Sequence, residues 1–226
     1  TLKNNGYEPF IATGRSSAET RDIMESANIH SGIFMNGQVV LYRDQLVYSS
    51  EIPTETVEKF HQMVKEDGYG LTAYNDKQFY LVASSPGAKD AYGFIHSNPP
   101  ALNPDFYKEN PINMMLFISL PPAEEKYKVA FPNLDFLRNT PYSVDVISKG
   151  NSKAEGIKRF LEHLNQEDAK TYAFGDGPND IEMLQAVSHP VAMGNALPIL
   201  KEIAEFITTD NTDNGIVNGL KHYGLI

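Results

Sequence analysis

Residues 175–180 read Gly175-Asp176-Gly177-Pro178-Asn179-Asp180 and directly follow the apolar run Tyr172-Ala173-Phe174. The apolar run predicts a short buried strand, and the glycines predict a sharp turn at its carboxyl end. Open α/β sheets bind their ligands at this end of their strands. Two carboxylates crowded there repel each other unless a cation joins them, and Mg²⁺ prefers oxygen ligands. The stretch therefore predicts a metal-assisted site on an α/β fold.

Composition limits the classes of protein to which the chain can belong. Its 226 residues are enough for one large domain or for a core domain with a smaller insert. A content of 41% hydrophobic and 21% charged residues is typical of a globular protein. A net charge of -10 without a basic stripe argues against broad binding to nucleic acid or to anionic membranes. The absence of cysteine excludes disulfides, thiolate metal sites and cysteine nucleophiles. Since no membrane-length apolar run and no signal peptide are visible, we expect a cytoplasmic protein.

Both ends of the chain have an α/β pattern. Near the start, the sequence predicts a strand over 9–12 that ends at Thr13-Gly14-Arg15, and then a helix over 16–27. A second strand ends at Asn36-Gly37 and leads into a hairpin. The pattern resumes with a helix at 152–164, and strands at 171–174, 190–193 and 206–208 then alternate with helices at 181–186, 196–204 and 215–222. Alternating strands and helices of this kind predict a mainly parallel sheet.

The middle of the chain has a different pattern. It predicts helix, strand, strand, and later helix, strand, strand again, with a proline- and asparagine-rich loop over 98–111 between them. This order predicts an α+β module inserted into the α/β frame. We therefore expect residues 1–51 and 148–226 to form one domain and residues 52–147 to form another.

Three places carry candidate site residues, and each has a simpler explanation. Thr13 and Gly14 can donate hydrogen bonds to a phosphate at a helix N-terminus, or they can form an ordinary strand-to-helix turn. Lys153 begins a helix, where its charge opposes the helix dipole, so it indicates an anionic partner unless it is a solvated surface lysine. Asp180 can cap the next helix, but capping does not explain Asp176, Asn179 or the glycines.

The sequence contains no motif for a histidine metal site, a serine nucleophile or a nucleotide-binding loop. The six histidines are scattered without metal-ligand spacing. There is no Gly-x-Ser-x-Gly elbow, no P-loop and no dinucleotide-binding glycine fingerprint.

Taken in order, the motifs resemble those of one known family. They are Ile11-Ala12-Thr13-Gly14-Arg15, Asn36-Gly37, Gly150-Asn151-Ser152-Lys153, Gly175–Asp180, Ala192-Met193-Gly194-Asn195-Ala196 and Asp213-Asn214-Gly215-Ile216. This series resembles the Cof-like branch of the haloacid dehalogenase (HAD) superfamily, whose members are phosphatases with a large α+β (type IIB) cap. The resemblance covers essentially the whole chain. It implies a Rossmann-like core, formed here by residues 1–51 and 148–226, with the cap between.

The resemblance also implies a function and roles for individual residues. It implies Mg²⁺-dependent hydrolysis of small phosphorylated metabolites, such as sugar phosphates, through an aspartyl-phosphate intermediate. Thr13 and Gly14 would hold the phosphate, and Lys153 would balance the charge of the phosphate and the nucleophile. Asp176 would ligate Mg²⁺, with Asp180 as a second ligand or as its support. Three further roles are implied: Asn179 would reach the phosphate or orient its loop, and Arg15 and Asn36 would line the site.

The chain departs from the family pattern at its start. Family members begin with a strand that ends in Asp-x-Asp and carries the nucleophile, and no such motif precedes Thr13. Because that strand lies in the middle of the family's sheet, its absence would leave two unpaired edges. We therefore expect further residues before Thr1, and we expect residues 1–226 alone to be inactive and not to form a stable monomer. A phosphomutase-type relative and an inactive homologue or fragment that binds phosphate ligands or a partner stay open as alternatives.

Overall fold

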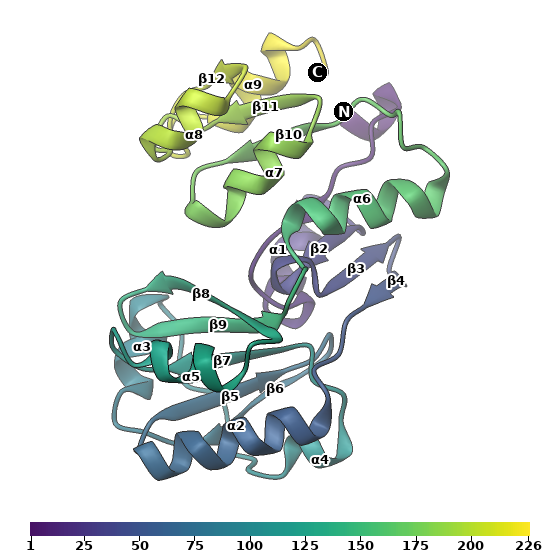
Figure 1. The fold of residues 1–226 in the computed structure, drawn as a ribbon. Helices are drawn as coiled ribbons and strands as arrows, with labels where there is room; N and C mark the ends of the chain where they lie inside the picture. Colours follow the sequence, from purple (N-terminus) through teal and green to yellow (C-terminus); the bar gives the residue numbers. More distant parts are fainter.

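The computed structural model describes residues 1–226, and its strands form three separate sheets (Figure 1). A four-stranded sheet has the order β1-β2-β3-β4, a three-stranded sheet has the order β10-β11-β12, and a five-stranded sheet has the order β6-β5-β7-β9-β8. The five-stranded sheet and its helices lie at the bottom of Figure 1, and the three-stranded sheet lies at the top. The chain is therefore a mixed α/β protein.

The four-stranded sheet comes from the first part of the chain. It contains β1 (Ile11–Ala12), β2 (Gly32–Phe34), β3 (Val39–Tyr42) and β4 (Gln45–Ser49). β1 and β2 pair in parallel, and β2, β3 and β4 pair antiparallel. The crossover is α1 (Ser17–Ala27), which begins with a capping box in which Ser16 and Glu19 hydrogen-bond in both directions. Two short 3₁₀ helices complete this part, η1 (Leu2–Asn5) and η2 (Met35–Gly37).

The three-stranded sheet is parallel throughout. Its strands are β10 (Tyr172–Gly175), β11 (His189–Ala192) and β12 (Phe206–Ile207). The predicted helices of this part are confirmed as α6 (Lys153–Leu164), α7 (Ile181–Ala186), α8 (Pro198–Ile203) and α9 (Gly215–His222), and η3 (Pro178–Asp180) precedes α7. No helix of the structure combines the length and the apolar character needed to cross a membrane.

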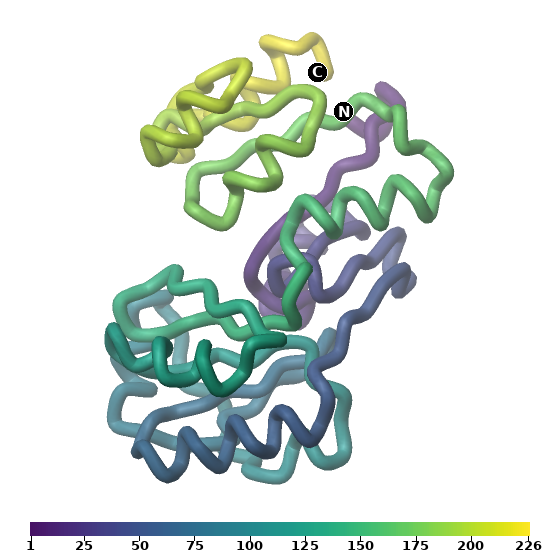
Figure 2. The backbone as a smooth tube through the Cα atoms, in the orientation of Figure 1, coloured from purple at the N-terminus to yellow at the C-terminus, as the bar shows by residue number.

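The predicted α/β frame is present, but its strands belong to two sheets. β1 and β10 each lie at an edge of their own sheet and do not pair with one another. The two edges share one hydrophobic neighbourhood, because Ala12 of β1 packs against the buried cluster that contains Ala173 of β10. The two ends of the chain also meet, as the smooth backbone in Figure 2 shows, and Asn5 Nδ2 donates to the Leu225 carbonyl at 2.8 Å.

The five-stranded sheet is antiparallel throughout. Its strands are β5 (Gly70–Tyr74), β6 (Phe79–Ala83), β7 (Met114–Ile118), β8 (Leu134–Thr140) and β9 (Ser143–Ser148). Its helices are α2 (Thr54–Asp67), α3 (Ala88–Phe94), α4 (Phe106–Glu109) and α5 (Glu124–Ala130). The loop predicted over 98–111 contains α4, whose Phe106 and Tyr107 are buried in the main apolar cluster. The pairing of β8 with β9 is irregular between Leu137 and Thr140.

A hydrophobic cluster joins the five-stranded sheet to the four-stranded sheet. Met24, Phe34, Met35 and Val39 come from the four-stranded sheet and its helix, and Tyr74, Met114 and Ile147 come from the five-stranded sheet. Because all seven residues are at most 7% exposed, this contact is a packed interior that fixes how the two parts meet. The carboxyl ends of β1 and β2 and the face of β9 that carries Ile147 lie near this contact.

Candidate active site

Asp180 is the buried centre of the Gly175–Asp180 turn. Its Oδ1 accepts a hydrogen bond from Lys153 Nζ at 2.6 Å, and both side chains are less than 9% exposed. Its Oδ2 accepts from the backbone N–H groups of Asp176 at 3.0 Å and Gly177 at 3.1 Å. The side chain makes no capping bond to α7. Asp180 therefore shapes its own turn and holds a lysine, and a capping role does not account for it.

Lys153 is a buried lysine and not a solvated surface residue. It is the first residue of α6, which Ser152 caps by accepting a hydrogen bond from the Glu155 N–H at 3.3 Å. A positive charge at a helix N-terminus is opposed by the helix dipole, and burial removes its hydration. Asp180 compensates for both effects. The pair thus places an ammonium group, already desolvated, next to the end of β10.

The close contact between β10 and Asp180 requires a glycine at position 175. A Cβ built on Gly175 would lie 2.7 Å from Cβ of Asp180 and 3.0 Å from its Cγ. Real Cβ atoms essentially never approach another atom so closely, so any side chain at position 175 would force Asp180 to shift. This requirement explains one of the glycines that mark the turn in the sequence.

Asp176 is the exposed carboxylate of the turn. Its Oδ2 accepts from Asn195 Nδ2 at 2.7 Å, and Asn195 Oδ1 accepts in turn from the Asn211 N–H at 3.2 Å. Its Oδ1 has no hydrogen-bond partner in the structure, which leaves it available to a ligand. Sequence reasoning did not assign a role to Asn195, although it belongs to the motif at 192–196 that follows the next strand of the same sheet.

Thr13 and Gly14 lie beyond β1 and meet the loop after β2. Thr13 Oγ1 accepts from the Arg15 N–H at 3.1 Å, and the Thr13 carbonyl accepts from the Asn36 N–H at 3.1 Å. A Cβ on Gly14 would lie 3.2 Å from Asn36 Nδ2, so this glycine permits a close approach. Arg15 is exposed and its guanidinium has no partner in the structure.

Asn36 connects these two parts of the site. It is 1% exposed and has the left-handed backbone conformation, with φ at 54°. Its Oδ1 accepts from Asn179 Nδ2 at 3.1 Å, so the loop after β2 touches the Gly175–Asp180 turn. The predicted residues are therefore brought together, with Thr13, Gly14 and Asn36 on one side and Asn179, Asp180 and Lys153 on the other.

Two residues of the five-stranded sheet also lie beside Asn36 and the Gly175–Asp180 turn, and the sequence did not predict a role for them. Asp145 of β9 accepts from Asn36 Nδ2 and from Asn139 Nδ2, both at 3.0 Å. Asn139 lies in the irregular part of β8, which runs beside η3. Burial raises the pKa of Asp145 to about 7, although both amides and the charge of Lys153 favour its ionised form. An aspartate inside the apolar run Ser143–Ile147 was the signal available in the sequence.

The donor set fits one part of a magnesium site. Asp176 has a free carboxylate oxygen, whereas both oxygens of Asp180 are occupied by Lys153 and backbone N–H groups. The structure holds no group of three or more histidine or acidic side chains that could bind a metal ion among themselves. Magnesium in enzymes is often held by one or two carboxylates together with substrate phosphate and water, a set to which Asp176 can contribute.

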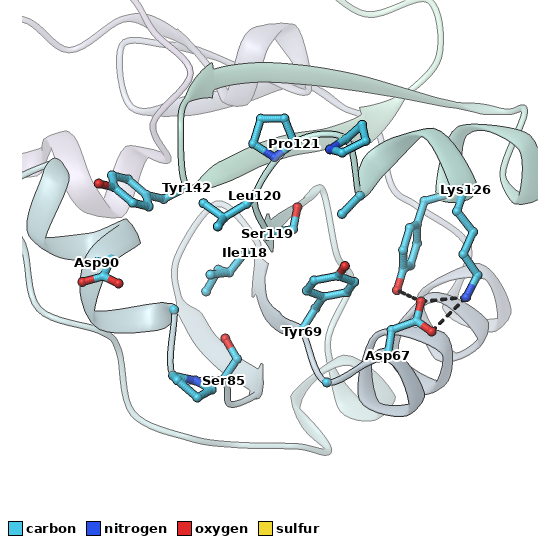
Figure 3. Close-up of a pocket in the computed structure, with 16 residues that line it drawn as sticks. Asp67, Tyr69, Ser85, Asp90, Ile118, Ser119, Leu120, Pro121, Lys126 and Tyr142 are labelled. Carbon is cyan, nitrogen blue, oxygen red and sulfur yellow. Dashed lines mark hydrogen bonds and ion pairs between the residues drawn. The ribbon is translucent and has the colours of Figure 1, made fainter.

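A separate cavity of about 690 Å³ lies within the five-stranded unit (Figure 3). It is lined by the end of α2, the start of α3 and the segment 118–123, and includes none of the residues described above. Of its three charged residues, Asp67 and Lys126 are paired at 2.8 Å, and Asp90 has no ion-pair partner. Tyr127 donates to the Asp67 carboxylate, also at 2.8 Å. Asp67, Lys126 and Tyr127 therefore satisfy one another within the wall of this cavity.

Comparisons with known proteins agree with this arrangement. Residues 1–220 match the family model described as haloacid dehalogenase-like hydrolase. A Bacillus subtilis (strain 168) protein named "Putative phosphatase YkrA" is 37% identical over 226 residues, which cover 100% of this chain and 88% of that protein.

Solved structures agree as well. A hypothetical protein of Geobacillus kaustophilus HTA426 has a TM-score of 0.93 and 32% identity, over 100% of this chain and 88% of that chain. A HAD subclass IIB sugar phosphatase, BT4131, has a TM-score of 0.84 and 27% identity over the same shares. The family model and these relatives cover nearly all of the sequence, including every motif of the site. This chain belongs to the haloacid dehalogenase-like hydrolase family and has the HAD fold.

Proposed function

We propose that the protein is a phosphatase that hydrolyses small phosphate monoesters, with sugar phosphates or similar metabolites as substrates, Mg²⁺ as cofactor and an aspartyl-phosphate as intermediate. The observation that carries the proposal is the buried Lys153–Asp180 pair at the carboxyl end of β10. It holds a positive charge at the edge of the sheet where α/β proteins bind ligands. The names of the relatives, "Putative phosphatase YkrA" and a subclass IIB sugar phosphatase, support the same reaction.

The proposal assigns binding of the phosphate to groups that come from three segments. Thr13 and Gly14 supply a hydroxyl and a backbone N–H near the N-terminal end of α1, and Lys153 supplies charge. Asn179 donates from the turn, while Asn36 and Arg15 line the site. Phosphoryl transfer depends mainly on positioning and on stabilising charge on the phosphoryl oxygens, and these groups are suited to both.

Asp176 is the proposed Mg²⁺ ligand, and Asp180 holds the turn in place behind it or supplies a second ligand. A bound Mg²⁺ would neutralise charge on the phosphate and orient it. Asn195 keeps one oxygen of Asp176 fixed at 2.7 Å, which leaves the other oxygen for the ion. Asp180 fixes the backbone N–H of Asp176 at 3.0 Å, so the ligand is held at its main chain and at its side chain.

The nucleophile of the proposed reaction is not among residues 1–226, in which no Asp-x-Asp occurs. In the family pattern, its strand lies between the strands that correspond here to β1 and β10. Both of these have an unpaired edge, and Ala12 and Ala173 belong to one hydrophobic neighbourhood. This arrangement supports a further strand between them, with residues 1–51 and 148–226 as the core and 52–147 as the cap. We further propose a cytoplasmic location.

The test measures hydrolysis of p-nitrophenyl phosphate by the full-length gene product, with Mg²⁺ and after chelation. Lys153→Ala and Asp176→Ala are each expected to lower kcat/KM by at least about a hundredfold, since each removes a charge that the transition state needs. Asp168→Ala, which changes an exposed aspartate outside the site, is the matched control and should retain wild-type activity. Calorimetric titration with Mg²⁺ should show binding that Asp176→Ala weakens.

Activity that survives chelation and both substitutions would refute the proposed mechanism. Activity that is absent from the wild-type full-length protein under all conditions would favour an inactive homologue. Transfer of the phosphoryl group to a second sugar hydroxyl in preference to water would favour a mutase-type relative.

A further inference from the structure

Asp145 is a carboxylate on the face of β9 that carries Ile147, and its direct neighbours across the sheet are the apolar residues Leu116 and Leu137. Along β9, Val144 and Val146 point into the interior of the five-stranded unit, and Ile147 belongs to the cluster that joins this unit to the four-stranded sheet. Asp145 alternates with the two valines and so shares the face of Ile147. None of the ion pairs in the structure includes it, although the pair Lys153–Asp180 is nearby. A salt bridge therefore does not explain an acidic residue at this position.

The position of Asp145 relative to the phosphate-binding turn is well defined. Its Oδ2 lies 3.3 Å from the point where a Cβ on Gly14 would stand, which is closer than an ordinary van der Waals contact, so only a glycine at position 14 leaves this space open. The same oxygen accepts from Asn36 and Asn139, so the two amides hold the carboxylate in one orientation. Its Oδ1 has no partner in the structure. A ligand bound at Thr13-Gly14 therefore has a fixed carboxylate beside it, with one oxygen free to accept a hydrogen bond.

A carboxylate with no cationic partner, partly buried beside a site, is costly to keep unless it serves that site. Burial accordingly raises the pKa of Asp145 to about 7. A substrate hydroxyl can donate to the free oxygen and recover part of the lost hydration. A second anion on the substrate would instead meet a like charge at close range in a poorly solvated place.

We propose that Asp145 is a specificity residue of the site, which favours phosphate monoesters whose leaving group carries hydroxyls and disfavours those that carry a second anionic group near the phosphate. The inference rests on the proposed phosphatase function and adds the residue that selects the leaving group. It also gives the inserted unit a direct part in recognition, because the selecting carboxylate comes from β9 while the phosphate is held by the loops after β1 and β10.

Two probe substrates that differ at one group test this role. Glycerol 3-phosphate and 3-phosphoglycerate share the phosphate and the neighbouring hydroxyl, and differ by a terminal CH₂OH or a carboxylate. The full-length protein is assayed with Mg²⁺ at pH 8, where Asp145 is ionised, and kcat/KM is measured for each probe. Asp145→Asn keeps the shape and an acceptor oxygen but removes the charge. We expect it to lower the ratio of kcat/KM, glycerol 3-phosphate over 3-phosphoglycerate, about tenfold.

Asp90→Asn is the matched control. Asp90 is an exposed aspartate of α3 in the same unit, so its substitution changes the net charge equally away from the site (Figure 3). We expect it to leave the ratio unchanged.

An unchanged ratio in Asp145→Asn, with normal hydrolysis of p-nitrophenyl phosphate, would overturn the assignment alone. An equal loss for both probes would also overturn it, since that result indicates a structural role for Asp145. If the wild type lacks Mg²⁺-dependent hydrolysis of p-nitrophenyl phosphate, the proposed function fails and the assignment fails with it. The two kinds of failure are therefore distinguishable.

Discussion

Breaking the Lys153–Asp180 pair should destabilise the protein strongly. Lys153→Met keeps most of the length and apolar stem of the side chain but removes the charge, which leaves Asp180 buried without a cation. At 2.6 Å and an effective dielectric constant of 20, the attraction is roughly 6 kcal/mol before the desolvation of both groups is subtracted. Removing one partner of a buried pair typically costs about 3–5 kcal/mol. Asp180 retains two backbone N–H donors, so we expect a loss of about 3 kcal/mol in the free energy of unfolding.

Urea unfolding of a double-mutant cycle measures this energy. Lys153→Met, Asp180→Asn and the double variant are compared with the wild type. Each single change leaves one charge buried and unpaired, whereas the double variant leaves none. We therefore expect the loss in the double variant to be smaller than the sum of the two single losses by about 2 kcal/mol. Lys158→Met, at an exposed position of the same helix, is the control and should stay within about 0.5 kcal/mol of the wild type.

A coupling energy near zero would refute the reasoning, because it would mean that the two charges do not stabilise each other. A Lys153→Met variant as stable as the wild type would also refute the reasoning, because it would show that the unpaired Asp180 carboxylate stays hydrated. The measurement does not depend on catalysis, so it tests the site independently of the proposed function.

Two further changes probe the same region. Gly175→Ala should lower the free energy of unfolding by about 1–3 kcal/mol and lower kcat, because a Cβ at this position would press on Asp180. The control Gly93→Ala adds a Cβ in open space within a helix and should be neutral or stabilising. Equal effects of the two substitutions would contradict the close contact between position 175 and Asp180. Asp145 has a pKa of about 7 in the folded state against 3.8 in its unperturbed state, so the folded protein binds this proton more readily and loses stability as the pH rises through this interval. Burial and Glu19 disfavour the charged form of Asp145, whereas Asn36, Asn139 and Lys153 favour it. In urea unfolding, we expect the free energy of unfolding of the wild type to fall by about 1–2 kcal/mol more than that of Asp145→Asn between pH 5 and pH 8. Equal losses in the two proteins would contradict the raised pKa.

Most elements of the fold were predictable from local sequence signals. The Ser16–Glu19 capping box, the asparagine and glycine residues that end helices, and the periodic apolar positions each mark a boundary through short-range contacts. α4 was missed because the segment 98–111 is rich in proline and asparagine, and the helix exists because Phe106 and Tyr107 are buried in the main cluster. The division of the frame into two sheets depends on which strand edges find partners, and local patterns carry no such information.

The site was predictable where its residues follow strand ends and not where they come from the other sheet. Thr13, Lys153, Asp176 and Asp180 lie in glycine-containing turns, and the resemblance of the ordered motifs to the HAD family implied that they meet. Asp145 and Asn139 reach the site only because the cluster around Ile147 and Phe34 fixes how β9 meets the loops. In a sequence, a charged residue within a strand that is buried on both faces indicates that its side chain contacts a site formed by another part of the fold.

The chemistry of Asn36 explains how one residue of the Asn36-Gly37 motif holds the site together. Its Nδ2 donates to Asp145, and its Oδ1 accepts from Asn179, so one amide faces an acceptor and a donor at the same time. Aspartate cannot donate when ionised, and an apolar residue can do neither. The left-handed backbone conformation at φ 54° further favours asparagine over longer or branched residues. Position 36 therefore requires a short amide on physical grounds, and this requirement links the sheet that carries Asp145 to the turn that carries Asp176 and Asp180.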